Sequence, residues 1–345
     1  MLLGHEKVNM LHLPTPLEYL PNISKDLGIE LYIKRDDLTP LAMGGNKLRK
    51  LEYLLKDAQD QGATFLLTVG GAQTNHGRLT MAVARKYGMR GAIVAVDPYP
   101  GELSANLLLD GMMGCDVYLK KPDNVHTEAE LFDMTVAEVK AAEEAKGEKV
   151  YYIPVGGSNE LGILGYYECA LELAEQVKDT SLEGCRVICP VGSMGTYMGL
   201  QVGIHNEALP MHLTGIGISP KPHGLVAYAM DYYDRIKDYY GKALPLELCA
   251  DDYDLISDYD RGAYNNPVKE VREAMYYMAE KEALILDPCY TGKAFAGLLE
   301  MVRSGRIAQG EKVVFVHTGG SPGIATPFHR VEIEKERDCY MHVIE

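Results

Sequence analysis

The sequence lacks the features that mark several large classes of protein. Its seven cysteines form no Cys-x-x-Cys pair, and its ten histidines show no spacing typical of zinc ligands. No apolar run reaches the roughly 20 residues that a membrane-spanning helix needs, and no basic segment with an apolar core and a cleavage site opens the chain. We therefore expect a soluble cytoplasmic protein with free thiols and without a bound metal.

Positive charge is also scarce. Lys and Arg number 34 against 49 Asp and Glu, which gives a formal net charge of −15. This balance argues against sequence-independent binding to nucleic acid or to an anionic membrane. Neither a Gly-Lys-Ser/Thr phosphate loop nor a Gly-x-Gly-x-x-Gly with a downstream acid occurs, which argues against nucleotide hydrolysis and against a dinucleotide dehydrogenase.

The length and the pattern of the chain indicate two α/β domains. The chain has 345 residues, of which 47% are apolar, enough for more than one core. We expect strands over residues 64–69, 91–96, 116–119, 150–154, 187–189, 213–218 and 312–317, and helices over about 48–55, 76–87, 104–114, 127–146 and 195–203. This alternation predicts open, mostly parallel sheets with helices on both faces, in two lobes that face one cleft.

Lys47 is the first candidate for a functional residue. It follows the turn Gly44-Gly45-Asn46 and begins an expected helix. A lysine at such a turn can point its amine into a cleft, where desolvation and nearby cations lower the pKa and make it a nucleophile toward aldehydes. A solvated lysine at a helix start is the ordinary alternative, so the motifs downstream decide between the two.

Two loops that join a strand to a helix carry hydrogen-bond donors. The loop from Gly192 to Thr196 combines glycines, hydroxyl groups and a helix N-terminus, which suits a phosphate, although such a loop can also be only a tight turn. The loop with Thr74 and Asn75 suits a carboxylate, and either residue can also simply cap the following helix.

Two tyrosines and a threonine complete the set of candidates. Tyr264 precedes a proline at an expected helix start, and Tyr290 precedes a helix start that contains glycine. With 23 tyrosines in the chain, neither is distinctive by itself. Thr318 ends the last expected strand and is followed by two glycines, which predicts a wall of the cleft.

In this order the motifs resemble the pyridoxal-phosphate enzymes of the tryptophan-synthase-β type (fold type II), and more narrowly the D-cysteine desulfhydrase and 1-aminocyclopropane-1-carboxylate deaminase family. The resemblance extends from Thr15-Pro-Leu-Glu-Tyr19 through Ile153-Pro-Val-Gly-Gly-Ser-Asn159 to His317-Thr-Gly-Gly320, nearly the whole chain. It implies a large cofactor-binding domain of residues 1–47 and 161–345, a small domain of residues 48–160, the cofactor in the cleft between them, and a homodimer.

The resemblance also implies roles for single residues. Lys47 matches the lysine that binds pyridoxal 5'-phosphate covalently and is the candidate base. The other cofactor-binding residues that it implies are Lys50, Asn75, Gly192, Ser193, Met194, Gly195, Thr196 and Thr318. Those that it implies at the substrate are Thr74, Asn75, His76, Tyr290 and Thr291, and Thr74, Tyr264 and Tyr290 join Lys47 as catalytic residues.

Two threonines place the chain in the desulfhydrase branch of this resemblance. The deaminases carry Glu where this chain has Thr291 and Leu where it has Thr318, whereas the desulfhydrases have Thr at both positions. A hydroxyl near the pyridine nitrogen holds that nitrogen protonated less well than a carboxylate, which suits the elimination of a good leaving group. We expect a carbon–sulfur lyase that converts D-cysteine to pyruvate, ammonia and hydrogen sulfide.

Other activities stay open at this point. They are the lysis of L-cysteate or L-cysteine, ring-opening deamination of the cyclopropane amino acid, and a catalytically silent binding protein. Departures from the usual family motifs at Thr74, Gly77, Tyr197 and Met198 leave the substrate and its chirality undecided.

Overall fold

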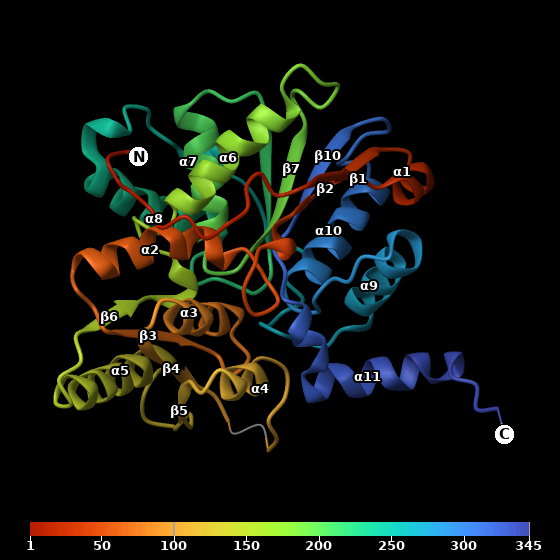
Figure 1. Ribbon diagram of the computed structural model, residues 1–345. Coiled ribbons are helices and arrows are strands. Elements are labelled where there is room, and N and C mark those ends of the chain that lie inside the picture. Colours follow the sequence, from red (N-terminus) through yellow and green to blue (C-terminus); the bar gives the residue numbers. More distant parts are fainter. Residues whose placement is uncertain (99–100, 345) are drawn as a thin grey trace.

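The computed structural model describes residues 1–98 and 101–344, which form two layered α/β units (Figure 1). The strands are β1 (Leu17–Tyr19), β2 (Glu30–Arg35), β3 (Phe65–Gly70), β4 (Arg90–Val96), β5 (Asp116–Lys120), β6 (Val150–Ile153), β7 (Arg186–Val191), β8 (His212–Gly217), β9 (Asp254–Ile256) and β10 (Lys312–His317). The helices are α1 (Pro21–Leu27), α2 (Lys47–Asp60), α3 (Asn75–Lys86), α4 (Ala105–Met112), α5 (Glu128–Glu144), α6 (Leu164–Val177), α7 (Gly195–Asn206), α8 (Leu225–Tyr240), α9 (Lys269–Glu282), α10 (Thr291–Arg303) and α11 (Pro327–Arg337).

The larger sheet has six strands in the order β1-β2-β10-β7-β8-β9. All neighbours pair in parallel except β1, which runs antiparallel to β2 at the edge. Both faces are covered, because Val187 and Cys189 of β7 pack in one core cluster with α7, while Ile188 packs in another with α10. Strands buried on two faces read as continuous apolar runs, as these do.

The smaller sheet has four parallel strands in the order β5-β4-β3-β6. Phe65, Leu67 and Val69 of β3 face α5. On the opposite face Leu66 packs with Leu79 and Val83 of α3. The two sheets confirm the predicted α/β class with open, mostly parallel sheets.

Helix α2 lies at the junction of the two units, below α6 and above α3 in Figure 1. Its apolar side chains share one core cluster with residues of both neighbouring helices, for example Leu51 and Leu54 with Tyr166 of α6 and Leu79 of α3. The four-stranded sheet falls within residues 48–160, but the domain boundaries that we derived from the resemblance stay a prediction.

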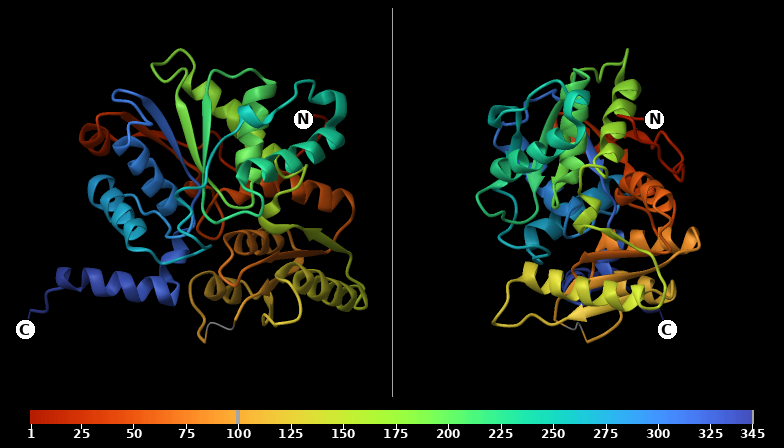
Figure 2. Two further views of the ribbon diagram at one scale, coloured as in Figure 1. Left: turned by 180° about the vertical axis from the view of Figure 1, so that it is seen from behind. Right: turned by 90° about the vertical axis from the view of Figure 1, so that its left-hand side faces the viewer.

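The views in Figure 2 show how the units and the chain ends are placed. The smaller sheet lies under the larger one, and α11 extends away from both toward the C-terminus. In the described part of the chain, no helix is long and apolar enough to cross a membrane.

Candidate active site

The turn before α2 is held in an unusual backbone conformation. Five consecutive residues, 41–45, have positive φ, and the first three of them are not glycine. Gly44 is required here, because a Cβ at this position would lie 2.1 Å from the carbonyl oxygen of Asp37. The N–H of Asn46 donates to the carbonyl oxygen of Thr318 at 3.0 Å, which fixes the start of α2 against the end of β10.

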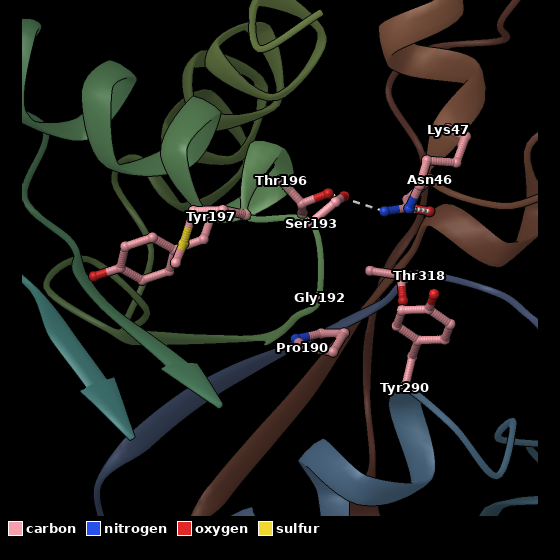
Figure 3. Close-up of a pocket in the computed structure, with 10 residues that line it drawn as sticks. Asn46, Lys47, Pro190, Gly192, Ser193, Thr196, Tyr197, Tyr290 and Thr318 are labelled. Carbon is pink, nitrogen blue, oxygen red and sulfur yellow. Dashed lines mark hydrogen bonds between the residues drawn. The ribbon is translucent and has the colours of Figure 1, made fainter. Parts of the chain in front are cut away.

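Lys47 is the first residue of α2, and its side chain points into a pocket rather than into solvent (Figure 3). Its Nζ donates to Asn46 Oδ1 at 3.1 Å and lies 5.8 Å from the centre of the Tyr290 ring. Burial lowers the pKa of Lys47 to about 8, and the nearby carboxylate of Asp287 opposes this shift. The amine is therefore a much better nucleophile near neutral pH than an exposed lysine.

The loop between β7 and α7 forms the opposite wall of the pocket. Asn46 Nδ2 donates to Thr196 Oγ1 at 2.9 Å and so bridges α2 and α7 (Figure 3). A Cβ on Gly195 would lie 2.4 Å from Ser158 Oγ and 2.8 Å from Lys50 Nζ, so only glycine fits. Helix α7 has no side-chain cap. The N–H of Gly195 donates to the carbonyl oxygen of Ser193, whereas those of Thr196 and Tyr197 have no acceptor among the described residues and are available to an anion.

Lys50 lies behind this loop and is fully buried. Its Nζ donates to the carbonyl oxygen of Gly156 at 3.1 Å and to Ser158 Oγ at 3.0 Å. Burial, and then the charge of Lys47, hold the pKa of Lys50 well below its usual range. Among the described residues no carboxylate forms an ion pair with Lys47 or Lys50.

These features fit pyridoxal 5'-phosphate. A phosphate dianion would compensate the two buried ammonium groups and accept from the α7 N–H groups and the hydroxyl groups of Ser193 and Thr196. Lys47 would meet the aldehyde. The donor set therefore suits both reactive ends of the cofactor.

The loop before α3 also offers donors. Thr74 caps the helix, since its Oγ1 accepts from the N–H of Gly77 at 3.2 Å. The backbone N–H groups of Asn75 and His76 have no acceptor among the residues that the structure describes. A substrate carboxylate can bind there, so the capping role and the binding role that the sequence suggested for this loop are compatible.

The side chain of His76 is directed into the interior of the smaller unit. Thr68 Oγ1 donates to the carbonyl oxygen of Ile153 at 2.9 Å and therefore accepts from His76 Nε2 at 2.8 Å. Burial, together with Lys47 and Lys50, holds the pKa of His76 well below its usual range. Only the backbone N–H of His76, and not a charged ring, is therefore available to a substrate carboxylate.

The two predicted tyrosines form a pair at the mouth of the pocket. Tyr290 lines it, and the hydroxyl groups of Tyr264 and Tyr290 lie 2.9 Å apart. Burial raises the pKa of Tyr290, so its hydroxyl keeps its proton at neutral pH. The Tyr264 residue is 46% exposed and lies on the outer side of the pair.

The two threonines that suggested the branch lie in different surroundings. Thr318 lines the pocket together with Lys47 and Gly192. Thr291 is fully buried, and its hydroxyl donates to Asp287 Oδ1 at 2.7 Å at the start of α10. The structure therefore brings Thr318 to the pocket, whereas it does not place Thr291 among the lining residues, and the substrate role of Thr291 stays a prediction.

Sequence reasoning missed five residues of the site. They are Asn46, Ser158, Pro190, Tyr197 and Asp287. Asn46 could have been found as the neighbour of Lys47, and Asp287 as the first residue of the motif that contains Tyr290. Ser158 lies in the segment from Ile153 to Asn159 that carries the resemblance, and Tyr197 directly follows the loop from Gly192 to Thr196. Both could therefore have been found from these motifs.

Comparisons with known proteins agree with this geometry. Residues 8–319 match the model of the protein family described as "Pyridoxal-phosphate dependent enzyme". The D-cysteine desulfhydrase of Klebsiella pneumoniae (strain 342) is 40% identical over 322 residues, which cover 92% of this chain and 95% of that protein. A putative 1-aminocyclopropane-1-carboxylate deaminase of Pyrococcus abyssi is also 40% identical over 322 residues, covering 92% of each chain.

A solved structure gives the same result for the fold. The protein described as an ACC deaminase homologue superposes with a TM-score of 0.84 at 33% identity and covers 96% of both chains. The fold type and the cofactor that the resemblance implied are thereby confirmed.

Proposed function

Because the chain belongs to the family of pyridoxal-phosphate-dependent enzymes, we propose that it is a lyase for α,β-elimination on a small amino acid with a sulfur leaving group. D-Cysteine, which would give pyruvate, ammonia and hydrogen sulfide, is the favoured substrate. The observation that carries this choice is the hydroxyl of Thr318 in a pocket whose described lining contains no carboxylate. The similarity to D-cysteine desulfhydrases supports it.

When bound, the cofactor supplies an electron sink for the carbanion at Cα. The residues of this chain supply position and protons. The N–H groups at the start of α3 orient the carboxylate of the substrate. Lys47 Nζ, with its pKa lowered to about 8, takes the proton from Cα.

The tyrosine pair supplies the proton that the leaving group needs. The Tyr290 hydroxyl donates to the departing sulfur, and Tyr264, 2.9 Å away, returns a proton to Tyr290 from the exposed side. Lys50 and the residues from Gly192 to Thr196 would hold the phosphate, and Asn75 would bind at the cofactor ring. The homodimer and the cytoplasmic location stay predictions.

Ring-opening deamination is the second candidate. It is favoured by the relatives described as putative 1-aminocyclopropane-1-carboxylate deaminases and by the solved homologue. No carboxylate is among the described lining residues, and Asp287 acts on Lys47 from outside that lining. The longer-lived carbanion of this reaction would therefore be less stabilised. We therefore rank it below the elimination of sulfide.

A panel of substrates tests the proposal. Steady-state release of sulfide and pyruvate is measured with D-cysteine and L-cysteine, sulfite release with L-cysteate, and 2-oxobutanoate release with the cyclopropane acid. The proposal predicts the highest kcat/KM for D-cysteine. Faster opening of the cyclopropane ring would contradict it, and cofactor absorbance without any turnover would indicate the silent binding protein.

Variants at the two threonines refine the test. Thr318→Leu should lower kcat/KM for sulfide release roughly tenfold, because it removes a hydroxyl from the pocket. Thr291→Ser is the matched control, since it keeps the hydrogen bond to Asp287 and should have little effect. Equal losses in both variants would mean that the Thr318 hydroxyl has no special role.

A further inference from the structure

A buried chain of polar side chains lies behind the first turn of α3. Arg78 of α3 and Asn106 of α4 are both fully buried. Arg78 Nε donates to Asn106 Oδ1 at 2.8 Å. A guanidinium group has no acceptor, so the Asn106 atom that faces it must be the oxygen.

The other end of the Asn106 amide has an equally fixed polarity. Its Nδ2 donates to the carbonyl oxygen of Gln73 at 2.7 Å and to Asn75 Oδ1 at 2.9 Å. A backbone carbonyl can only accept, which requires the same orientation of Asn106 that Arg78 requires. Two independent partners of fixed polarity therefore determine which way this amide points.

The orientation of the Asn106 amide also determines the orientation of the Asn75 amide. Because Asn75 Oδ1 accepts from Asn106, its Nδ2 points the other way, toward the loop after β10 that continues from Thr318. A Cβ on Gly320 would lie 3.0 Å from Asn75 Nδ2. In the described ranges 1–98 and 101–344 no acceptor takes a hydrogen bond from this Nδ2, so it is available to a bound group.

We propose that Asn106 is a positioning residue that orients the carboxamide of Asn75, so that a donor and not an acceptor is offered to the cofactor. The inference rests on the proposed place of Asn75 beside the cofactor ring. The oxygen attached to the pyridine ring of pyridoxal phosphate accepts a hydrogen bond when it is ionised. The oxygen of a reversed Asn75 amide would repel it. The site thus depends on an amide that does not itself touch the bound group.

Asn106→Asp tests the proposal in the holoenzyme. The aspartate keeps an acceptor for Arg78 but presents its second oxygen to Asn75 and to the carbonyl oxygen of Gln73, both of which accept from Asn106 Nδ2 in the wild type. Asn75 then turns its NH₂ group toward residue 106 and its oxygen toward the cofactor. We expect the Kd for pyridoxal phosphate to rise about 10- to 100-fold, the loss of one hydrogen bond to a charged group. The absorbance band of the bound cofactor should shift as well.

A double-mutant cycle separates positioning from a general structural effect. If Asn106 acts through Asn75, Asn106→Asp should change the Kd by less than twofold in an Asn75→Ala background. An equal loss in both backgrounds, or an unchanged Kd and spectrum in Asn106→Asp, would overturn the proposal. Should Asn106→Asp fail to fold, Asn106→Ala removes the donor without a new charge and enters the same cycle.

Asn22→Asp is the matched control. The Asn22 side chain on α1 is exposed and also donates its Nδ2 to a backbone carbonyl, that of Lys281, at 2.8 Å. The same chemical change at this position should leave the Kd unaltered. Cofactor affinity and absorbance do not depend on which amino acid is the substrate, so an incorrect substrate assignment leaves this test intact.

Discussion

The first turn of α2 carries three buried cations, and they are compensated in opposite ways. Arg49 donates to Asp36 Oδ2 through Nε at 2.8 Å and to Glu172 Oε2 through Nη1 at 3.0 Å. Lys47 and Lys50, on the same turn, bind only amide, carbonyl and hydroxyl oxygens. The three cations are similarly buried on one helix, but only Arg49 is compensated by carboxylates of the protein. Lys47 and Lys50 have neutral partners only.

The pKa shifts follow the same division. Burial alone would lower the pKa of Arg49, but the charge of Asp36 raises it well above its usual range. The pKa values of Lys47 and Lys50 are lowered, because burial there has no comparable carboxylate to oppose it. Burial by itself therefore does not indicate a functional cation, whereas burial without a counter-charge does.

The largest expected effect follows from removing Arg49. Arg49→Met leaves the fully buried Asp36 without its partner and should lower the free energy of unfolding by about 3–5 kcal/mol. Urea titration followed by circular dichroism measures the change. Lys56→Met, which breaks the exposed pair with Asp60 on the same helix, should cost less than about 1 kcal/mol. Equal losses would contradict the division between the two kinds of cation.

Lys50→Met should change stability in the opposite direction. In the cofactor-free protein it removes a buried amine that folding must either leave uncompensated or deprotonate, so the free energy of unfolding should rise by roughly 1–3 kcal/mol. The Kd for pyridoxal phosphate should rise at the same time about 10- to 100-fold, through the loss of a charged contact. Denaturation and cofactor titration of the same sample check both signs. A cofactor-free variant that is less stable than the wild type refutes the interpretation.

The pH dependence of cofactor capture reports on Lys47. The folded pKa of about 8 lies below the ordinary 10.5 of lysine, so the folded protein favours the neutral amine. Below pH 8 the lowered pKa of Lys47 reduces the free energy of unfolding, and this reduction disappears as the pH approaches 10.5. The rate at which the cofactor-free protein captures pyridoxal phosphate should rise with a midpoint near pH 8, measured by stopped-flow absorbance.

Asp287 provides the control for this measurement. Its charge raises the pKa of Lys47. Asp287→Asn should therefore move the midpoint to lower pH. Its single amide oxygen can still accept from the N–H of Tyr290 or from that of Thr291, which donate to different oxygens of the aspartate. A midpoint close to that of an exposed lysine in the wild type would show that Lys47 is solvated.

The smallest effect concerns Asp110, an acid with no compensating hydrogen bond. It is fully buried, and no described residue donates to either of its carboxylate oxygens. Burial raises its pKa to about 7, although Arg78 opposes the shift. The raised pKa destabilises the fold increasingly as the pH rises from about 4 to 7.

Asp110→Asn removes this titration. Between pH 5 and pH 8 the wild type should lose roughly 1–3 kcal/mol relative to the variant. Urea titrations of both proteins at the two pH values measure the difference. Parallel stability curves would show that the carboxylate is already ionised at pH 5.

The sequence predicted the strands that position the site, because buried parallel strands are long apolar runs. The seven expected strands correspond to β3–β8 and β10 within two residues at each end. It did not predict β1 and β9, which have three residues each, or the six-residue β2. It also did not predict the helices α1, α6, α8 and α11. Helices α6 and α8 both begin without a side-chain cap, so neither carries a local signal for its start.

The candidate site divides in the same way. Lys47 and the loop from Gly192 to Thr196 could be predicted, since a turn or a strand–glycine–helix junction is visible locally. The chain from Arg78 through Asn106 to Asn75 could not, because it depends on how α3 and α4 pack. The hydrogen bond from the Thr291 hydroxyl to Asp287 could not be predicted either, because it depends on the side-chain geometry at the start of α10.

The position of α2 also determines how the molecule comes apart. Its apolar side chains pack with α3 on one side and with α6 on the other, within one continuous core. The two sheets are separate, but the shared core should make the two units unfold cooperatively. We expect a single transition in calorimetry. A fragment of residues 48–160 would keep α2 and lose α6, and the bared face of that helix would drive it to aggregate rather than to fold as an independent domain.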